Sequence, residues 1–483
     1  MENPAVDLAI IGSGSGNSLV TPFWDDRRVV IAEAGVFGGT CLNVGCIPTK
    51  MYVRPAALAR GPEEAARLGL VQRTESVDWP GMRDRIFGRI DAISAAGERY
   101  RRDELDTVEL ISQRVRLTGT HGFAAADGTR VEARQLVIAA GSRAVIPDIP
   151  GIDLPQVHTS DTIMRLPELP KRVLIIGGGY IAAEFANIFS AFGSSVVQVH
   201  RGAQLLKRAD AEIAARFTAQ AAGQWDLRLE RNVIAIRPAD DGGVVADIAS
   251  GTAARGDGTT SAVEQTAADV VLVAAGRTPN SDRVGAAEAG IDLHDDGRIA
   301  VDAYQRVLSG GAPVPGLYAL GDISSASQLK HVANHEARVV AHNLEHPHDL
   351  REAHHQAIPA AVFTDPEVAQ VGLTEAEAVA AFGAEQITAK LQAYGDTAYG
   401  WALEDQSGVF KVVADRRDGR ILGAHVMGYQ ASNLIQVVIS AMSFGIDAHT
   451  AARGQYWIHP ALMEVAENAL LGLDVPVGER PAL

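Results

Sequence analysis

The sequence predicts an α/β fold with two Rossmann-like dinucleotide-binding domains, and two glycine-rich turns carry that prediction. Each turn follows a short apolar strand and precedes a helical pattern: one follows residues 7–11 and the other follows residues 172–176. In such turns glycine lets the backbone approach a diphosphate, whose charge is met by helix amides. The chain has 483 residues, which at about 150 residues per domain leaves room for a third domain.

Composition indicates an acidic globular protein. Its 43 Lys and Arg against 59 Asp and Glu give a formal net charge of −16, which argues against broad binding to nucleic acid or anionic membranes. No apolar stretch approaches the roughly 18–20 residues of a membrane-spanning helix, and the N-terminus lacks the pattern of a secretory signal. We therefore expect a cytoplasmic protein whose partners are small molecules or protein.

The first glycine turn and the strand after it predict one dinucleotide site. Gly12, Gly14 and Gly16 form the turn, and Glu33 ends the strand 28–32 about 20 residues later. A carboxylate in that position can bind the hydroxyl groups of a ribose. Asn17 stands where the usual fingerprint has a third glycine, so we expect the helix that starts here to pack differently against the strand.

The second glycine turn predicts a second dinucleotide site, one that favours NADP. Its motif runs Gly177-Gly178-Gly179-Tyr180-Ile181-Ala182, with alanine in the tolerated third position. The next strand, 196–199, is followed by His200, Arg201 and Lys207 and by no carboxylate. Arg201 and Lys207 can pair with a 2′-phosphate, which a carboxylate would repel. A solvated basic loop is the alternative interpretation.

Other apolar strands predict where the chain crosses between domains. Residues 136–140 lead into Gly141 and residues 270–275 into Gly276. The strand 316–320 leads into Gly321-Asp322, where the carboxylate can bind a sugar or ribityl hydroxyl or cap a helix. Residues 239–262 resemble strands joined by an exposed loop. The histidines of 346–355 lack ordered ligand spacing, so we expect a polar linker there and no metal site.

The cysteines are the sharpest compositional signal. The chain has only two, Cys41 and Cys46, with four residues between them. A close pair in an otherwise thiol-free chain favours redox chemistry over a disulfide-stapled secreted fold. Two buried, inert cysteines are the alternative.

Residues 38–50, GGTCLNVGCIPTK, resemble the redox-active motif of the pyridine-nucleotide disulfide oxidoreductases, the flavoprotein family of glutathione reductase, dihydrolipoyl dehydrogenase and mycothione reductase. The resemblance implies that reduced nicotinamide passes hydride to FAD, that the flavin reduces a Cys41–Cys46 disulfide, and that the dithiol reduces a substrate disulfide. Cys46 would be the thiolate beside the flavin, and Cys41 would attack the substrate.

Three more residues acquire roles from the same resemblance. Lys50 would lie by the flavin and pair with Glu184, and Tyr180 would cover the nicotinamide pocket. The alternative interpretation is a structural ion pair and a core aromatic residue.

Residues 456–464, YWIHPALME, resemble the family's histidine and glutamate signature near the C-terminus. His459, oriented by Glu464, would protonate the thiolate that leaves a substrate disulfide. In the family this pair comes from the other subunit, so the resemblance implies a homodimer with its active site shared between subunits.

The resemblance covers nearly the whole chain and implies its division. Residues 1–149 and 277–347 would bind FAD, 150–276 would bind NAD(P)H, 348–472 would form an α+β dimerisation domain, and 473–483 would be a loosely ordered tail. The implied FAD contacts are Gly12, Gly14, Gly16, Glu33, Gly39, Thr40, Lys50, Gly141, Asp322, Val332 and Ala333. The implied NADPH contacts are Gly177, Gly179, Tyr180, Ile181, Arg201, Lys207 and Gly276.

Three stretches indicate the branch of the family. Residues 12–18, 330–337 and 454–457 resemble the mycothione reductase branch, which also has Asn17. The predicted activity is therefore NADPH-dependent reduction of mycothiol disulfide. The lack of a third cysteine disfavours mercuric reductase and the large thioredoxin reductases. NAD-dependent dihydrolipoyl dehydrogenase, glutathione reductase and a flavoprotein redox sensor without turnover are the alternatives.

Overall fold

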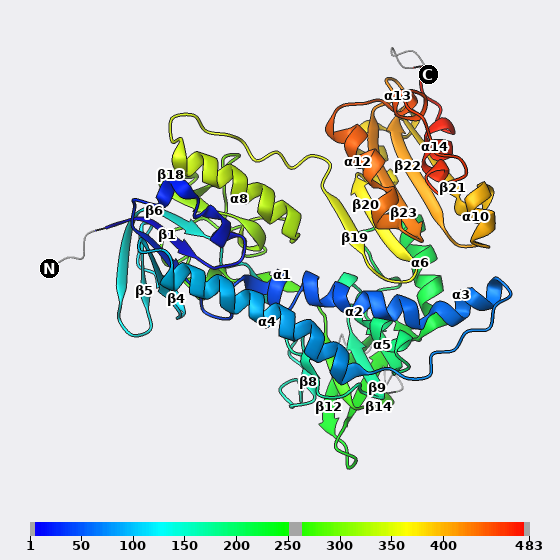
Figure 1. Ribbon diagram of the computed structural model, residues 1–483, viewed down its shortest axis with the longest axis horizontal. Coiled ribbons are helices and arrows are strands. Elements are labelled where there is room, and N and C mark those ends of the chain that lie inside the picture. Colours follow the sequence, from blue (N-terminus) through cyan, green and yellow to red (C-terminus); the bar gives the residue numbers. More distant parts are fainter. Residues whose placement is uncertain (1–4, 251–262, 478–483) are drawn as a thin grey trace.

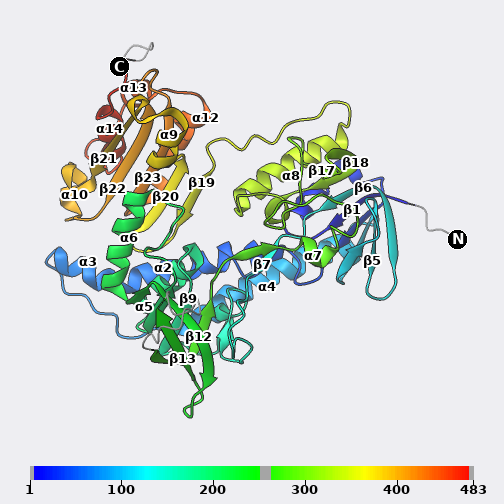
Figure 2. The same cartoon turned by 180° about the vertical axis from the view of Figure 1, so that it is seen from behind.

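The computed structural model describes residues 5–250 and 263–477, which form three lobes (Figures 1 and 2). The N-terminal lobe lies at the left of Figure 1, the middle lobe at the bottom and the C-terminal lobe at the upper right. Part of the loop expected in 239–262 and the last six residues of the expected tail lie outside the described residues. None of the helices in the described ranges combines the length and apolar character that crossing a membrane requires.

The N-terminal lobe is built on an eight-stranded sheet with a parallel centre. β1 lies between β6 and β2, with β3 beyond β2, and β18 joins the other edge of β6 in parallel. Leu8, Ala9 and Ile10 are fully buried, because both faces of such a sheet are covered. The strands are β1 (Val6–Ile11), β2 (Val29–Ala32), β3 (Val108–Ile111), β4 (Val115–Leu117), β5 (Gly122–Ala125), β6 (Arg130–Ile138), β17 (Arg306–Ser309) and β18 (Ala312–Ala319).

The middle lobe repeats this arrangement with a five-stranded parallel sheet, in the order β11-β10-β9-β15-β8, and adds a three-stranded antiparallel sheet. Its helices are α5 (Tyr180–Ala191) and α6 (Ala211–Gln224). Its strands are β8 (Val157–His158), β9 (Arg172–Ile176), β10 (Ser195–His200), β11 (Asp226–Leu229), β12 (Arg231–Pro238), β13 (Val244–Ser250), β14 (Glu264–Ala268) and β15 (Val270–Val273). Two parallel sheets, each with its glycine turn, confirm the predicted α/β class.

The two predicted crossings between lobes lie side by side. β7 (Ser142–Ala144) pairs antiparallel with β16 (Arg277–Pro279), and the amide of Val145 donates to the carbonyl of Gly276 at 2.9 Å. The chain therefore leaves and re-enters the N-terminal lobe through one short two-stranded ribbon.

The C-terminal lobe is a five-stranded antiparallel sheet, in the order β19-β20-β23-β22-β21, with helices packed against it. Its strands are β19 (Pro359–Val362), β20 (Glu367–Gly372), β21 (Ile387–Ala393), β22 (Val409–Asp415) and β23 (Ile421–Gly428). Its helices are α9 (Glu375–Phe382), α10 (Ala398–Ala402), α11 (Ala431–Leu434), α12 (Gln436–Ser443), α13 (Ala448–Arg453) and α14 (Glu464–Leu471).

Helices that join the lobes position the candidate site. α2 follows α1 and runs beneath the C-terminal lobe alongside α5, while α4 crosses from the middle lobe to the N-terminal lobe (Figure 1). The remaining helices are α1 (Gly39–Asn43), α2 (Cys46–Ala59), α3 (Gly61–Arg67), α4 (Trp79–Asp103), α7 (Ser281–Val284) and α8 (Lys330–Glu345).

The helix expected after the first glycine turn is the one local prediction that fails. The chain forms only a four-residue 3₁₀ turn, η1 (Gly16–Leu19), and a second short turn, η2 (Pro22–Trp24). Proline is disfavoured inside an α-helix because it lacks an N–H and clashes with the preceding turn, so Pro22 ends any helix here. The second glycine turn, by contrast, opens the twelve-residue α5.

Candidate active site

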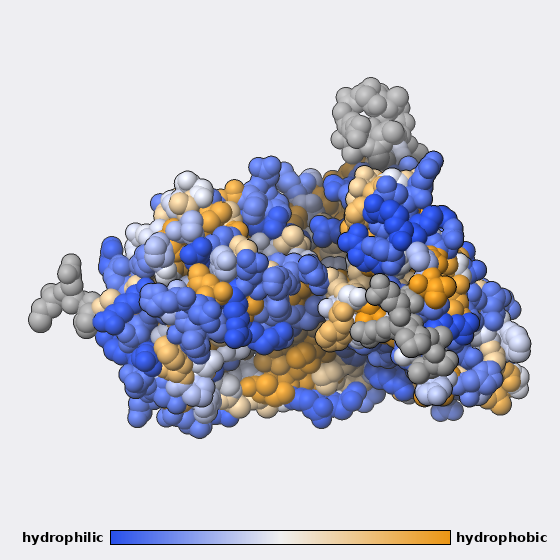
Figure 3. All heavy atoms as spheres, turned by 90° about the horizontal axis from the view of Figure 1, so that it is seen from above, coloured by the Kyte–Doolittle hydropathy of each residue, from blue (hydrophilic) through white to orange (hydrophobic). Residues whose placement is uncertain are grey.

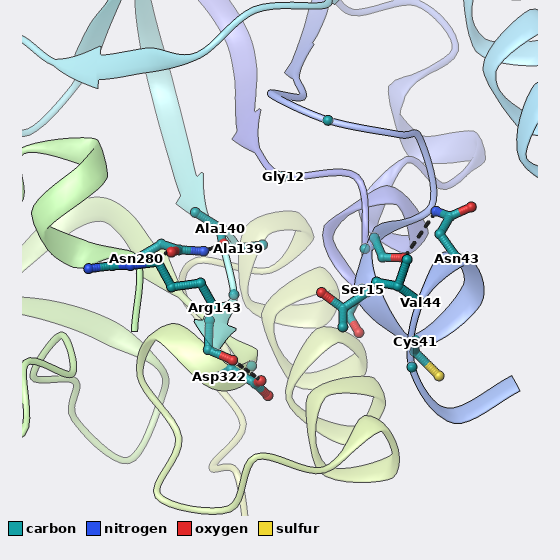
Figure 4. Close-up of a pocket in the computed structure, with 18 of the residues that line it drawn as sticks. Gly12, Ser15, Cys41, Asn43, Val44, Ala139, Ala140, Arg143, Asn280 and Asp322 are labelled. Carbon is teal, nitrogen blue, oxygen red and sulfur yellow. Dashed lines mark hydrogen bonds between the residues drawn. The ribbon is translucent and has the colours of Figure 1, made fainter. Parts of the chain in front are cut away.

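A cavity of about 570 Å³ lies where the first glycine turn, α1, α2, α5 and the loop after β18 meet (Figure 4). In Figure 4 Ser15 and Cys41 lie on one side of it, with Arg143 and Asp322 opposite. The predicted site residues that line it are Gly12, Gly14, Glu33, Gly39, Thr40, Cys41, Cys46, Lys50, Gly141, Tyr180, Ile181, Glu184, Asp322 and Ala333.

Backbone packing in this cavity fits a dinucleotide. Gly12 has a positive φ of 106°, and a Cβ there would lie 2.3 Å from the carbonyl oxygen of Ala139. A Cβ on Gly39 would lie 2.6 Å from the Cα of Gly14. Only glycine lets the backbone segments pack this closely. The absence of side chains also leaves the backbone of the turn accessible from the cavity, as a bound diphosphate requires.

Two carboxylates, those of Glu33 and Asp322, line the cavity and can accept hydrogen bonds from the hydroxyl groups of a bound ligand. Glu33 accepts hydrogen bonds from the Ser13 amide at 2.9 Å and from the Ser13 hydroxyl at 2.6 Å. Asp322 accepts one from the Ser142 hydroxyl at 2.6 Å. Each carboxylate thus lines the cavity with an orientation set by a neighbouring serine, which suits the ribose and ribityl ends of FAD.

Two predicted FAD contacts do not line the cavity. A Cβ on Gly16 would lie 2.8 Å from Cγ2 of Ile10, so this glycine lets the turn pack on β1. Val332 is buried, with 3% of its surface exposed. Their roles as FAD contacts therefore stay predictions.

The two thiols share a hydrogen bond and differ in protonation. Cys41 lies in α1 and Cys46 is the first residue of α2, and both are free thiols. The hydrogen bond from Cys41, helped by the charge of Lys50, lowers the pKa of Cys46 to about 7 although burial opposes it. The same hydrogen bond, with burial, raises the pKa of Cys41. Cys46 therefore forms its thiolate at a much lower pH than Cys41, which keeps its proton.

The predicted ion pair is present beside these thiols. Lys50 Nζ lies 2.7 Å from both carboxylate oxygens of Glu184, which is 3% exposed. Glu184 also accepts a hydrogen bond from the Phe363 amide at 3.0 Å, so the carboxylate joins α2, α5 and the C-terminal lobe. Tyr180 lines the same cavity and stays 42% exposed.

The predicted histidine and glutamate also meet, but away from the thiols of their own chain. His459 Nδ1 lies 2.7 Å from Oε1 of Glu464, the first residue of α14. With Nδ1 donating to the carboxylate, Nε2 is the nitrogen left to exchange a proton. The imidazole is 72% exposed, and neither residue lines the cavity that holds Cys41.

The second glycine turn has the geometry of the first. Gly177 has a φ of 142°, and a Cβ there would lie 2.2 Å from the carbonyl oxygen of Ala274, while Gly179 faces open space. Gly276, with a φ of 138°, lies between β15 and β16, directly before Arg277. Arg201 and Lys207 are exposed after β10 and form no ion pair within the described ranges. Burial, reinforced by these two charges, lowers the pKa of His200.

Two further cations of the cavity, Arg277 and Lys330, were not among the site residues predicted from the sequence. Arg277 Nε donates to the Ser142 hydroxyl at 2.8 Å, so Arg277 supports the serine that orients Asp322. Lys330 Nζ donates to the Ser15 hydroxyl at 2.8 Å. The sequence signals for these residues were that Arg277 follows Gly276, that Ser15 lies inside the first glycine turn, and that Lys330 opens the stretch 330–337, whose resemblance to the family implies a helix start near the flavin.

The chain matches a known protein family and is similar to several of its members. Residues 6–337 match the family described as "Pyridine nucleotide-disulphide oxidoreductase", and residues 358–470 match the dimerisation domain of that family. A mycothione reductase of Mycobacterium tuberculosis is 50% identical over 97% of this chain and 99% of that protein. A glutathione reductase of Burkholderia cepacia is 33% identical over 96% of this chain and 98% of that protein.

A solved structure agrees with these relatives. The HOCl-induced flavoprotein disulfide reductase RclA from Escherichia coli superposes with a TM-score of 0.80 at 25% identity, covering 96% of this chain and 99% of that one. The family binds FAD, and its mycothione and glutathione reductases use NADPH. The thiol pair, the two glycine turns and these matches together show that the chain belongs to the pyridine nucleotide-disulphide oxidoreductase family, as an FAD-dependent disulfide oxidoreductase.

Proposed function

We propose that the protein reduces a low-molecular-weight disulfide with electrons from NADPH, and that mycothiol disulfide is its substrate. The observation that carries the proposal is the Cys41–Cys46 pair, which lines the cavity with one thiol poised as a thiolate. The identity of 50% with a mycothione reductase, against 33% with a glutathione reductase, supports the choice of disulfide.

FAD, when bound, supplies the two-electron transfer from reduced nicotinamide that turns a Cys41–Cys46 disulfide into the dithiol. The protein's own residues then handle the protons and sulfur atoms. Lys50 stabilises the negative charge of the Cys46 thiolate, and Glu184 holds Lys50 in place through two contacts of 2.7 Å.

Reduction of the substrate is a pair of thiol exchanges. Cys41 loses its proton and attacks one sulfur of the substrate disulfide, so the substrate S–S bond breaks and a Cys41–substrate disulfide forms. The released thiolate takes up a proton. Cys46 then attacks the sulfur of Cys41, which re-forms the Cys41–Cys46 disulfide and releases the second thiolate for protonation. Two electrons leave the dithiol and two thiols leave the site.

A base is needed at the first exchange because the Cys46 thiolate raises the pKa of Cys41. We assign that role to His459, which takes the proton of Cys41 and passes it to the leaving thiolate. Glu464 accepts from Nδ1 at 2.7 Å, which orients the ring and leaves Nε2 to exchange the proton.

The histidine reaches the thiols in a homodimer. Within one chain the His459–Glu464 pair does not line the cavity, so His459 of the partner subunit is the proposed proton donor. The neighbouring Tyr456 and Ile458 are 89% and 78% exposed, and Phe444 is 81% exposed. Apolar groups also show on the C-terminal lobe, at the right of Figure 3. A second subunit would cover them.

Arg201 and Lys207 are the proposed ligands of the 2′-phosphate of NADPH. Both follow β10, both are exposed, and neither has an ion pair within the described residues. Their charges are therefore available to a phosphate.

The test is a grid of oxidation rates. Purified protein is given NADPH or NADH, each with mycothiol disulfide, glutathione disulfide or lipoamide. We expect rapid turnover only with NADPH and mycothiol disulfide. Turnover of NADH with lipoamide instead would identify a dihydrolipoyl dehydrogenase and refute the assignment of Arg201 and Lys207, and NADPH with glutathione disulfide would refute the choice of mycothiol.

A further inference from the structure

The first glycine turn lacks the long helix that would face a diphosphate. η1 spans four residues, Gly16–Leu19, and its N-cap residue Ser15 makes no side-chain capping bond. α5, at the second turn, spans twelve residues. A long helix offers aligned amides and the positive end of its dipole to an anion. A single 3₁₀ turn offers less of both, so the first turn needs positive charge from elsewhere.

Lys330 brings that charge to the turn. It is the first residue of α8 and lines the cavity. Its Nζ donates to the hydroxyl of Ser15 at 2.8 Å, and the same hydroxyl lies 3.4 Å from Oδ1 of Asn334, one helical turn further along α8. In Figure 4 Ser15 stands at the wall of the cavity, on the same side as Cys41.

Three cations that line the cavity, Lys330, Arg114 and Arg283, have no ion pair with a carboxylate in the ranges 5–250 and 263–477, and of these Lys330 is the one bonded to the first glycine turn. Lys50 is paired with Glu184, and Arg143 is paired with Asp282. Lys330 has no carboxylate within ion-pair distance in the ranges 5–250 and 263–477. Among the lysines and arginines that line the cavity, it is the one in those ranges with a hydrogen bond to the turn 12–17.

The turn η1 is also held by hydrogen bonds from Arg101, which does not line the cavity. Arg101 of α4 donates from Nε to Oδ1 of Asn17 at 2.9 Å and from a terminal nitrogen to the carbonyl of Asn17 at 3.0 Å. Asn17 occupies the position of the usual third glycine. Its side chain is therefore used to hold a turn that no long helix anchors.

We propose that Lys330 binds the diphosphate of FAD and replaces the electrostatic contribution of the missing helix, while Asn17 and Arg101 position the turn. Charge-assisted hydrogen bonds to phosphate are about twice as strong as neutral ones. The proposal depends on FAD binding and is independent of which disulfide is the substrate.

Release of FAD from the holoenzyme tests the proposal. Flavin fluorescence after dilution reports the dissociation rate for the wild type, Lys330→Gln, Lys330→Arg and the control Arg338→Gln, which removes an exposed charge from the same helix. We expect Lys330→Gln to release FAD roughly 10-fold to 100-fold faster, the range that a hydrogen bond to a charged group supports. Lys330→Arg and Arg338→Gln should stay near the wild type.

Two further readouts separate this role from others. Salt should speed release from the wild type more than from Lys330→Gln, because salt screens only a charge that is present. This part of the test uses the wild type even if a variant folds poorly, and salt-independent release there would overturn the proposal. The flavin reduction potential should not change in Lys330→Gln. A changed potential with unchanged FAD release would show that Lys330 acts on the flavin ring, and equal effects in Arg338→Gln would show a general charge effect; either result refutes the proposal.

Discussion

At the scale of single residues, the two thiols differ because one hydrogen bond couples them. Cys41 donates to Cys46, which lowers the pKa of Cys46 and raises the pKa of Cys41. Lys50 adds a positive charge on the side of Cys46. The same pair thus provides a stable thiolate and a protonated thiol at one pH, which suits a division of roles in disulfide exchange.

Removing the donor should raise the pKa of Cys46. In Cys41→Ala the largest cause of the low pKa is gone, so titration of the Cys46 thiolate, followed by its ultraviolet absorbance, should give a pKa clearly above about 7. Cys41→Ser keeps a hydroxyl donor and should show a smaller rise. An unchanged pKa in Cys41→Ala would contradict the hydrogen-bond assignment.

Cys41→Ser also tests the catalytic role of this thiol. We expect it to abolish disulfide turnover, because Cys46 alone cannot complete the two exchanges, and to leave reduction of the flavin by NADPH intact. Steady-state rates and anaerobic flavin bleaching measure the two steps separately. Disulfide turnover that persists in Cys41→Ser would refute the assignment of Cys41 as the attacking thiol.

At the scale of elements, α8 supports the loop that carries Asp322. Glu336 of α8 is 1% exposed and accepts from the Gly321 amide at 2.7 Å. Its other oxygen lies 2.9 Å from Nε2 of His355, in the segment that leads to the C-terminal lobe. A buried carboxylate thus joins the loop after β18 to His355 of the linker.

This contact makes stability depend on pH. The hydrogen bond to Glu336 raises the pKa of His355 in the folded protein. Its stabilisation is therefore complete below the unfolded value of about 6.5 and is lost as pH rises through the folded value. The melting temperature should fall across that window in the wild type. The fall should be smaller in His355→Gln, whereas the exposed-site control His348→Gln should behave as the wild type; parallel curves for all three would refute the linkage.

The loop after β10 should select the nicotinamide cofactor. In the double variant Arg201→Ala/Lys207→Ala the KM for NADPH should rise about 10-fold to 100-fold, because charge-assisted bonds to the 2′-phosphate are lost. The KM for NADH should barely change, since NADH has no such phosphate. Arg216→Ala, an exposed arginine of α6 paired with Glu212, is the control. Equal losses with both cofactors would mean that the loop does not read the phosphate.

At the scale of the whole molecule, the proposed active site needs two chains. Cys41 faces the cavity between the first two lobes, whereas His459 stands exposed on the C-terminal lobe. The match to a dimerisation domain over residues 358–470 is consistent with an interface there.

Mixed dimers test that arrangement. Cys41→Ser and His459→Ala homodimers should each be nearly inactive. A hybrid of the two should have one intact site, with Cys41 of one subunit and His459 of the partner subunit, so random reassortment should restore about a quarter of the wild-type activity. Activity that stays at the sum of the two inactive parents after reassortment would place both residues in one chain.

Much of the fold was predictable because its signals are local. The apolar runs 7–11 and 172–176, each before a glycine turn, form strands as expected, and the run 270–275 forms a strand over its first four residues, Val270–Val273. The helix after Gly16 was not predictable from the glycine pattern, because Pro22 and the hydrogen bonds from Arg101 to Asn17 override it. Of the expected FAD contacts, Gly16 and Val332 do not line the cavity, since sequence spacing does not tell which side of a turn or helix faces it.

The sequence by itself determined the chemistry: two glycine turns, a thiol pair four residues apart and a histidine five residues before a glutamate are local patterns, readable along the chain. Only the tertiary structure decided which distant residues complete them. It joins Asp322 to Ser142 and Lys330 to Ser15, whereas the Lys50–Glu184 pair was already implied by the family resemblance. Those pairs depend on how the lobes pack, because a side-chain contact between residues more than a hundred positions apart exists only once the intervening elements have folded around a common core.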